Sequence, residues 1–158
     1  MSDSPLSRST IQEMSQLLST AAISNLMADG HVSFVALAIG RDRSLTPILL
    51  ETVDVQQKEA LGRMLRLLAP HAGAIAIICE SWYVETTAAS TALDIRPSEH
   101  EGRKESILVT VSSPHGDLVA NIPFERDSTG KPVEPKQVTA QWQSLRGVQM
   151  NLSGFYNV

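Results

Sequence analysis

Cysteine is almost absent from this chain, which carries a single thiol, Cys79, among its 158 residues. One thiol cannot form an internal disulfide, and nothing near it has the spacing of zinc ligands. Cys79 ends an apolar run that begins at Ala74, where a small buried residue is the ordinary use of cysteine. The sequence therefore predicts no disulfide, no metal and no cofactor, and a catalytic thiol is the weaker alternative.

Basic residues are too few for a typical nucleic-acid binder. The chain has thirteen Lys and Arg residues and seventeen Asp and Glu residues, which gives a net charge of −4. Phosphate neutralisation supplies most of the affinity for nucleic acids, so the net charge argues against a nucleic-acid partner. The chain also lacks an apolar run long enough to cross a bilayer and a signal-like start at residues 1–8. We therefore expect a cytoplasmic protein without a membrane partner.

Apolar residues at helical spacing predict two long helices. The first spans residues 9–29, begins with a capping box of Ser9 and Gln12, and ends at Gly30. The second begins at Asp54 and ends before Pro70. Its predicted buried stripe consists of Leu61, Met64, Leu65 and Leu68.

Short β-branched runs between turn residues predict the strands. The longest apolar run is continuous instead of alternating, which is typical of a central strand buried on both faces. A short final helix over residues 135–146 is predicted from Val138, Trp142 and Leu145. The predicted strands are residues 32–39 and 48–53 as a hairpin, 74–84 in the centre, and 107–111 and 118–124 as a second hairpin.

The predicted order is α-β-β-α-β-β-β-α, an α+β fold with one antiparallel or mixed sheet of about five strands and helices packed on one face. One domain spans residues 9–146, after a flexible tail over 1–8. The apolar segment 147–158 is expected to dock on its own domain or on a partner. Profilin-like and roadblock-like domains share this order, and many of them dimerise. By that analogy of topology we expect a homo-oligomer, namely a dimer, or a protein partner.

A charge-dense segment over residues 94–105 is the candidate site. Most such segments are solvated loops. If the strand that starts near Arg103 pairs beside the strand that ends near Glu80, then Glu80, His100, Arg103 and Glu105 converge at one rim of the sheet. The two carboxylates could then act as acid and base.

The favoured alternative for these acids is a structural ion pair, in which Glu80 or Glu105 pairs with Arg103 or Arg96. Trp82, Arg96 and Lys104 are the candidate binding residues. The Trp82 ring could stack on a base, although packing is the commoner use of an aromatic ring at a strand end. We find no nucleophile elbow, no zinc-protease motif and no phosphate-binding glycine loop.

The residues Glu80-Ser81-Trp82, followed by the run from Arg96 to Glu105, resemble a family of small uncharacterised bacterial and phage proteins. Its pattern is an E-A-W-type strand end followed by P-S-x-H-P-x-R-x-E. This chain departs from it at Ser81 and at Glu101. The resemblance implies no activity and only a phage or mobile-element origin. The sequence thus favours a non-enzymatic binding or assembly module, with a small hydrolase-like enzyme as the alternative.

Overall fold

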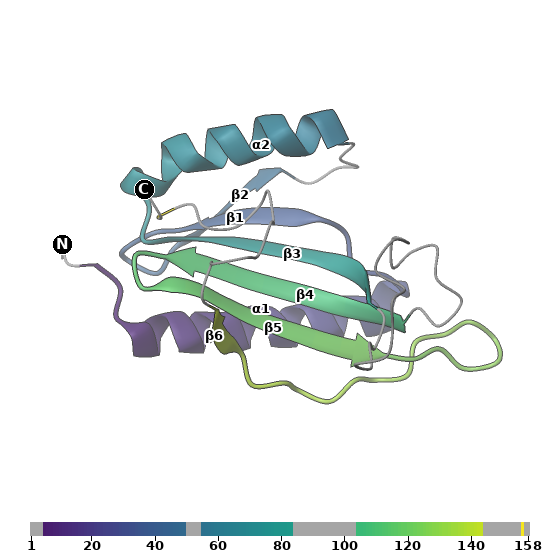
Figure 1. The fold of residues 1–158 in the computed structure, drawn as a ribbon. Helices are drawn as coiled ribbons and strands as arrows, with labels where there is room; N and C mark the ends of the chain where they lie inside the picture. The colour runs from purple at the N-terminus through teal and green to yellow at the C-terminus, as the bar shows by residue number, and fades with distance from the viewer. Residues whose placement is uncertain (1–4, 50–54, 84–103, 144–155, 157–158) are drawn as a thin grey trace, which may run out of the picture.

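The computed structural model describes residues 5–49, 55–83, 104–143 and Tyr156. An antiparallel sheet of six strands, in the order β2-β1-β3-β4-β5-β6, carries one helix on each face (Figure 1). The α+β class is as predicted, but the helices do not share a face and the sheet has one strand more than expected. The strands are β1 (Val35–Ile39), β2 (Leu45–Leu49), β3 (Ala74–Tyr83), β4 (Lys104–Ser113), β5 (Gly116–Phe124) and β6 (Gln141–Gln143).

Helix α1 (Arg8–Asp29) packs on β3, β4 and β5. Its N-cap is Ser7, whose Oγ accepts a hydrogen bond from the Thr10 backbone N–H at 3.1 Å. The predicted capping box at Ser9 is therefore wrong by two positions. Leu6 is buried in the core beneath the helix, so the segment expected to be a flexible tail contacts the domain at this residue. The predicted end at Gly30 is confirmed, with φ at 81°.

Helix α2 (Val55–Leu68) packs on the other face, over β1 and β3, and the short helix η1 (Ala69–His71) follows it. Leu61 and Leu65 are buried as predicted, but Met64 and Leu68 are 41% and 38% exposed. Their predicted burial is wrong, because the sheet reaches only one side of the apolar stripe. The predicted cap Asp54 lies outside the described residues.

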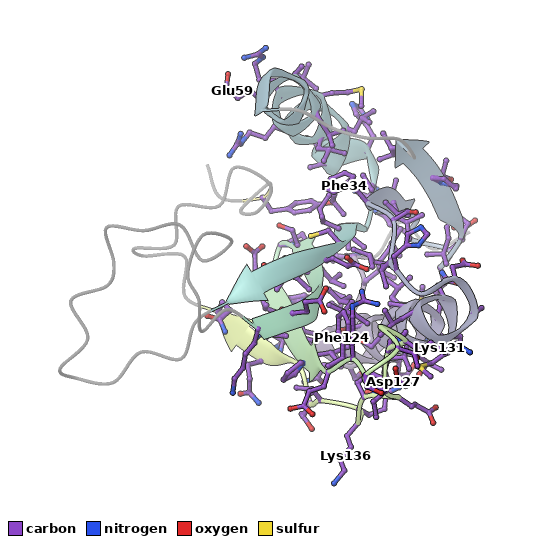
Figure 2. The ribbon with its side chains drawn as sticks, turned by 90° about the vertical axis from the view of Figure 1, so that its right-hand side faces the viewer. Phe34, Glu59, Phe124, Asp127, Lys131 and Lys136 are labelled. Carbon is purple, nitrogen blue, oxygen red and sulfur yellow. The ribbon has the colours of Figure 1, made fainter. Side chains whose placement is uncertain are left out.

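Strand β3 lies inside the sheet between β1 and β4 and is buried on both faces, as its continuous apolar run predicted. Ala76 and Ile78 belong to the core under α1, whereas Ile75 and Ile77 belong to the core under α2. Figure 2 shows Phe34 on the α2 side and Phe124 on the α1 side of the sheet.

The hairpin of β4 and β5 is also confirmed. Its turn is stabilised by Ser113, whose Oγ accepts a hydrogen bond from the His115 backbone N–H at 3.1 Å. Gly116 completes the turn with φ at 113°, a conformation that favours glycine.

Residues 133–143 are extended, and they end in β6. The predicted helix over 135–146 is therefore wrong as far as Gln143, and the remainder lies outside the described residues. Val138, Ala140 and Trp142 recur at a spacing of two and pack against the core under α1, as an extended chain requires.

Tyr156 is the described residue of the apolar segment 147–158. It packs against the core under α2, and its Oη donates a hydrogen bond to the Ala72 carbonyl oxygen at 3.3 Å. Desolvation by burial raises the pKa of the Tyr156 phenol from 10.0 to about 12, and the nearby Arg41 charge partly opposes this. Among the described residues, no helix is long and apolar enough to span a membrane.

The raised pKa makes folding stability depend on alkaline pH through Tyr156. The fold favours the neutral phenol, so its contribution is complete below pH 10 and is lost between pH 10 and about 12. In a titration of phenolate absorbance at 295 nm, Tyr156→Phe should remove a transition near pH 12. The variant should also lose less stability over this pH range. Both tyrosines of the wild type titrating near pH 10 would contradict the burial of Tyr156.

Candidate functional site

Two predicted site residues, Glu80 and Glu105, lie near each other on neighbouring strands. In the register of β3 and β4, Glu80 is opposite Ile107, and Glu105 is opposite Trp82. Residues directly opposite share a face, as do residues two apart, so both acids lie on the face that α1 covers. The pairing of these two strands is the condition on which the predicted shared site at the rim depended.

The Glu80 carboxylate binds the chain that follows α1. Its Oε1 accepts a hydrogen bond from the Val32 backbone N–H at 2.6 Å. The side chain is otherwise exposed at the end of the buried part of β3. The contact joins residues 48 positions apart and fixes the path of the chain between α1 and β1.

The Glu105 carboxylate pairs with Arg126, which follows β5. Arg126 Nε donates to Glu105 Oε2 at 2.8 Å, and the two side chains are only 29% and 21% exposed. Arg126 Nη1 also donates to the carbonyl oxygens of Gly30 at 3.0 Å and Gly130 at 3.1 Å. The guanidinium carbon lies 5.4 Å from the centre of the Phe124 ring, within cation–π range.

The turn after β5 positions one of these acceptors. Asp127 Oδ1 accepts hydrogen bonds from the Thr129 hydroxyl at 2.6 Å and from the backbone N–H groups of Thr129 and Lys131 at 2.8 and 3.1 Å. The bonds from Thr129 lower the pKa of Asp127 below its usual value. Gly130 follows with φ at 85°, and its carbonyl oxygen accepts from Arg126.

Together these contacts form a polar brace, defined here as Glu80, Glu105 and Arg126 with their backbone partners. The brace connects the end of α1 to β3, β4 and the chain after β5. The last turn of α1 holds no basic residue, so Arg126 supplies the cation that the negative end of the helix dipole favours. The described contacts of both acids are therefore structural.

Of the other predicted site residues, the structure describes Trp82 and Lys104. His100, Arg103 and Arg96 lie outside the described residues, so their convergence with the acids stays a prediction. Trp82 is opposite Glu105 in the sheet, and the exposed Lys104 is opposite Tyr83 at the start of β4.

Arg126 was not among the predicted site residues. The available signal was its position, two residues after Phe124 and four after Ile122, which places it on the same face as these core residues if the strand pattern continues. A cation at that position needs an acid or carbonyl groups at the edge of the core.

Within the described ranges, no three His, Cys, Asp or Glu side chains are grouped so that they could hold a metal ion. A pocket of about 110 Å³ lies elsewhere, between the first half of α1 and residues 138–140, and no predicted site residue lines it. Comparisons of the chain with protein-family models, curated proteins and solved structures give no significant match.

Proposed function

We propose that the protein is a non-enzymatic assembly module that forms a homodimer through the exposed side of α2. The supporting observation is that the apolar surface of this helix is wider than the part covered by the sheet. Leu67 is 76% exposed, and Met64 and Leu68 are also exposed on the same side.

The helical geometry distinguishes the part of the apolar stripe that packs on the sheet from the part that is exposed. At 3.6 residues per turn, the positions from Leu67 through Met64 and Leu68 to Leu65 cover about 160° of the circumference. The buried Leu61 and Leu65 take up only about 40° of that arc. A stripe of this width is typical of a helix with apolar contacts on two sides.

A second copy of α2 fits the exposed part of the stripe. Ala60, Met64 and Leu67 are all exposed and follow the four-and-three spacing of a helix–helix seam. In an antiparallel pair related by a two-fold axis near Met64, each Leu67 faces the small Ala60 of the second copy. The stripe is thus self-complementary, as a two-fold interface requires.

The polar brace supports a non-enzymatic function as well. Arg126 already pairs with Glu105, and Glu80 already accepts from the backbone of Val32. Acids held in this way contribute to stability, whereas a catalytic acid–base pair needs carboxylates that can exchange protons with a substrate.

Leu67→Glu tests the proposed interface. A charge at this position should convert the dimer to a monomer, because burying an unpaired carboxylate in an apolar seam is strongly unfavourable. The matched control is Leu17→Glu on α1, where an apolar side chain is 63% exposed. Light scattering after size exclusion measures the mass. Equal masses for Leu67→Glu and the wild type would exclude α2 as the interface.

A small hydrolase-like enzyme remains the second candidate, because Glu80 and Glu105 share one face at diagonal positions. An enzyme often keeps catalytic acids at the expense of stability. Under that function Glu80→Ala would leave the free energy of unfolding unchanged or increased. If Glu80 belongs to a structural brace, the same substitution removes the acceptor of the Val32 N–H and lowers the free energy of unfolding.

A further inference from the structure

Among the described residues, the outer edge of β5 is only partly paired. Strand β6 pairs with β5 over Asp117–Val119, three residues of a nine-residue strand. Within the part of the chain that the structure describes, residues 120–124 pair with β4 alone. Pro123, which has no amide hydrogen, limits any further pairing at the far end.

The chain that closes this edge, residues 133–143, is thinly packed. Each of its residues is exposed or half-buried, whereas Leu118, Ala120 and Ile122 of β5 are buried. A side-chain hydrogen bond connects the segment to α1, in which Gln137 Nε2 donates to Thr20 Oγ1 at 2.8 Å in an exposed position. Segments with few buried apolar groups are the ones that open locally at low free energy.

The contact between this segment and α1 is also imperfect. The pocket of about 110 Å³ lies there, lined by Gln12, Ser15, Gln16 and Ser19 of α1 and by residues 138–140. Ser15 is 1% exposed, and its Oγ has no hydrogen-bond partner among the described residues. A buried hydroxyl that the segment leaves without a protein partner adds nothing to the stability of the contact between residues 133–143 and α1.

Trp142 is the main anchor of the segment. Its ring packs against the core under α1, and the Arg8 guanidinium carbon lies 4.4 Å from the ring centre. The His115 ring meets it edge-on at 6.5 Å. The apolar residues Val138, Ala140 and Trp142 alternate with polar ones along an extended backbone.

From this arrangement we propose that the outer edge of β5 is a strand-accepting site that residues 133–143 occupy in the free protein. The partner it takes is an extended peptide with apolar side chains at alternate positions, the chemistry of the segment it replaces. Main-chain hydrogen bonds along the edge give affinity, and the pockets for alternate side chains give specificity. The site is separate from α2 and does not depend on the proposed dimer.

Hydrogen exchange of the full chain tests the opening. The amides of Gln141–Gln143 should exchange at least tenfold faster than those of Ile107–Val111 in β4, through an opening that leaves β4 protected. Trp142→Ala should accelerate exchange in β6 further, and Gln137→Ala should do so to a smaller extent. The proposal would be overturned if the β6 amides exchanged at the same rate as the β4 amides, through global unfolding alone.

Binding of a labelled synthetic peptide of residues 135–143 tests the site itself. Fluorescence anisotropy should show saturable binding of the peptide to the full chain. The affinity should be about tenfold or more higher for the Trp142→Ala variant than for the wild type, because the variant's own segment competes less well for the edge. Binding should slow exchange at Asp117–Val119. The control peptide carries Val138→Asp and Trp142→Asp and should not bind. Equal binding of the two peptides, or no binding by either protein, would overturn the proposal.

Discussion

Replacing Arg126 with methionine should lower the free energy of unfolding by about 2–3 kcal/mol. Methionine keeps much of the aliphatic bulk but removes the three hydrogen bonds to Glu105, Gly30 and Gly130. The Glu105 carboxylate would then lose its cation in a position where its side chain is only 21% exposed. Chemical denaturation of the purified variants measures the loss.

The matched control is the exposed ion pair of Arg43 and Glu13. Its closest atoms are 3.8 Å apart, and the side chains are 59% and 67% exposed. Arg43→Met should therefore change stability by less than about 1 kcal/mol. A double-mutant cycle with Glu105→Gln isolates the pair energy. Equal effects of Arg126→Met and Arg43→Met would contradict the structural brace.

Ile107→Ala should have the largest effect on stability, about 3–4 kcal/mol. Ile107 is fully buried under α1, opposite Glu80 on β3 and Ile122 on β5. Truncation removes buried apolar surface and leaves a cavity in the main core, since neighbouring strands cannot close around it.

The neighbouring residue gives the control for Ile107. Leu108 points to the opposite face of β4 and is half-buried, so Leu108→Ala should cost about 1 kcal/mol by its smaller loss of buried area. Thermal and urea unfolding measure both variants. A larger loss for Leu108→Ala would mean that the register of β4, and with it the shared face of Glu80 and Glu105, is wrong.

Local patterns were sufficient for much of the fold. Gly30 after an apolar stripe predicted the end of α1, and the continuous run from Ala74 predicted a strand buried on both faces. The two short apolar runs over 107–111 and 118–124 predicted the hairpin of β4 and β5. Each signal depends on residues within one element and its cap.

The segment 135–146 could not be resolved from local pattern, because its residues satisfy two periods. Val138, Trp142 and Leu145 follow helical spacing, whereas Val138, Ala140 and Trp142 follow strand spacing. The pairing of Gln141–Gln143 with β5 decides for the strand, and pairing between strands is not a local property.

The candidate site, too, could be predicted only in part from local sequence patterns. The sequence brought Glu80 and Glu105 together through the expected pairing of their strands, which the register supports. It did not identify their described partners, because Val32 is 48 positions from Glu80 and Arg126 is 21 from Glu105. Such partners depend on how α1 and the chain after β5 cross the sheet.

Sedimentation equilibrium of the wild-type protein over a range of concentrations tests the proposed assembly most directly. The α2 seam predicts a mass of about 34 kDa, twice the 17.1 kDa of one chain, that falls toward the monomer on dilution. Leu67→Glu should stay at the monomer mass throughout. A wild-type mass of one chain at every concentration would contradict the proposed function.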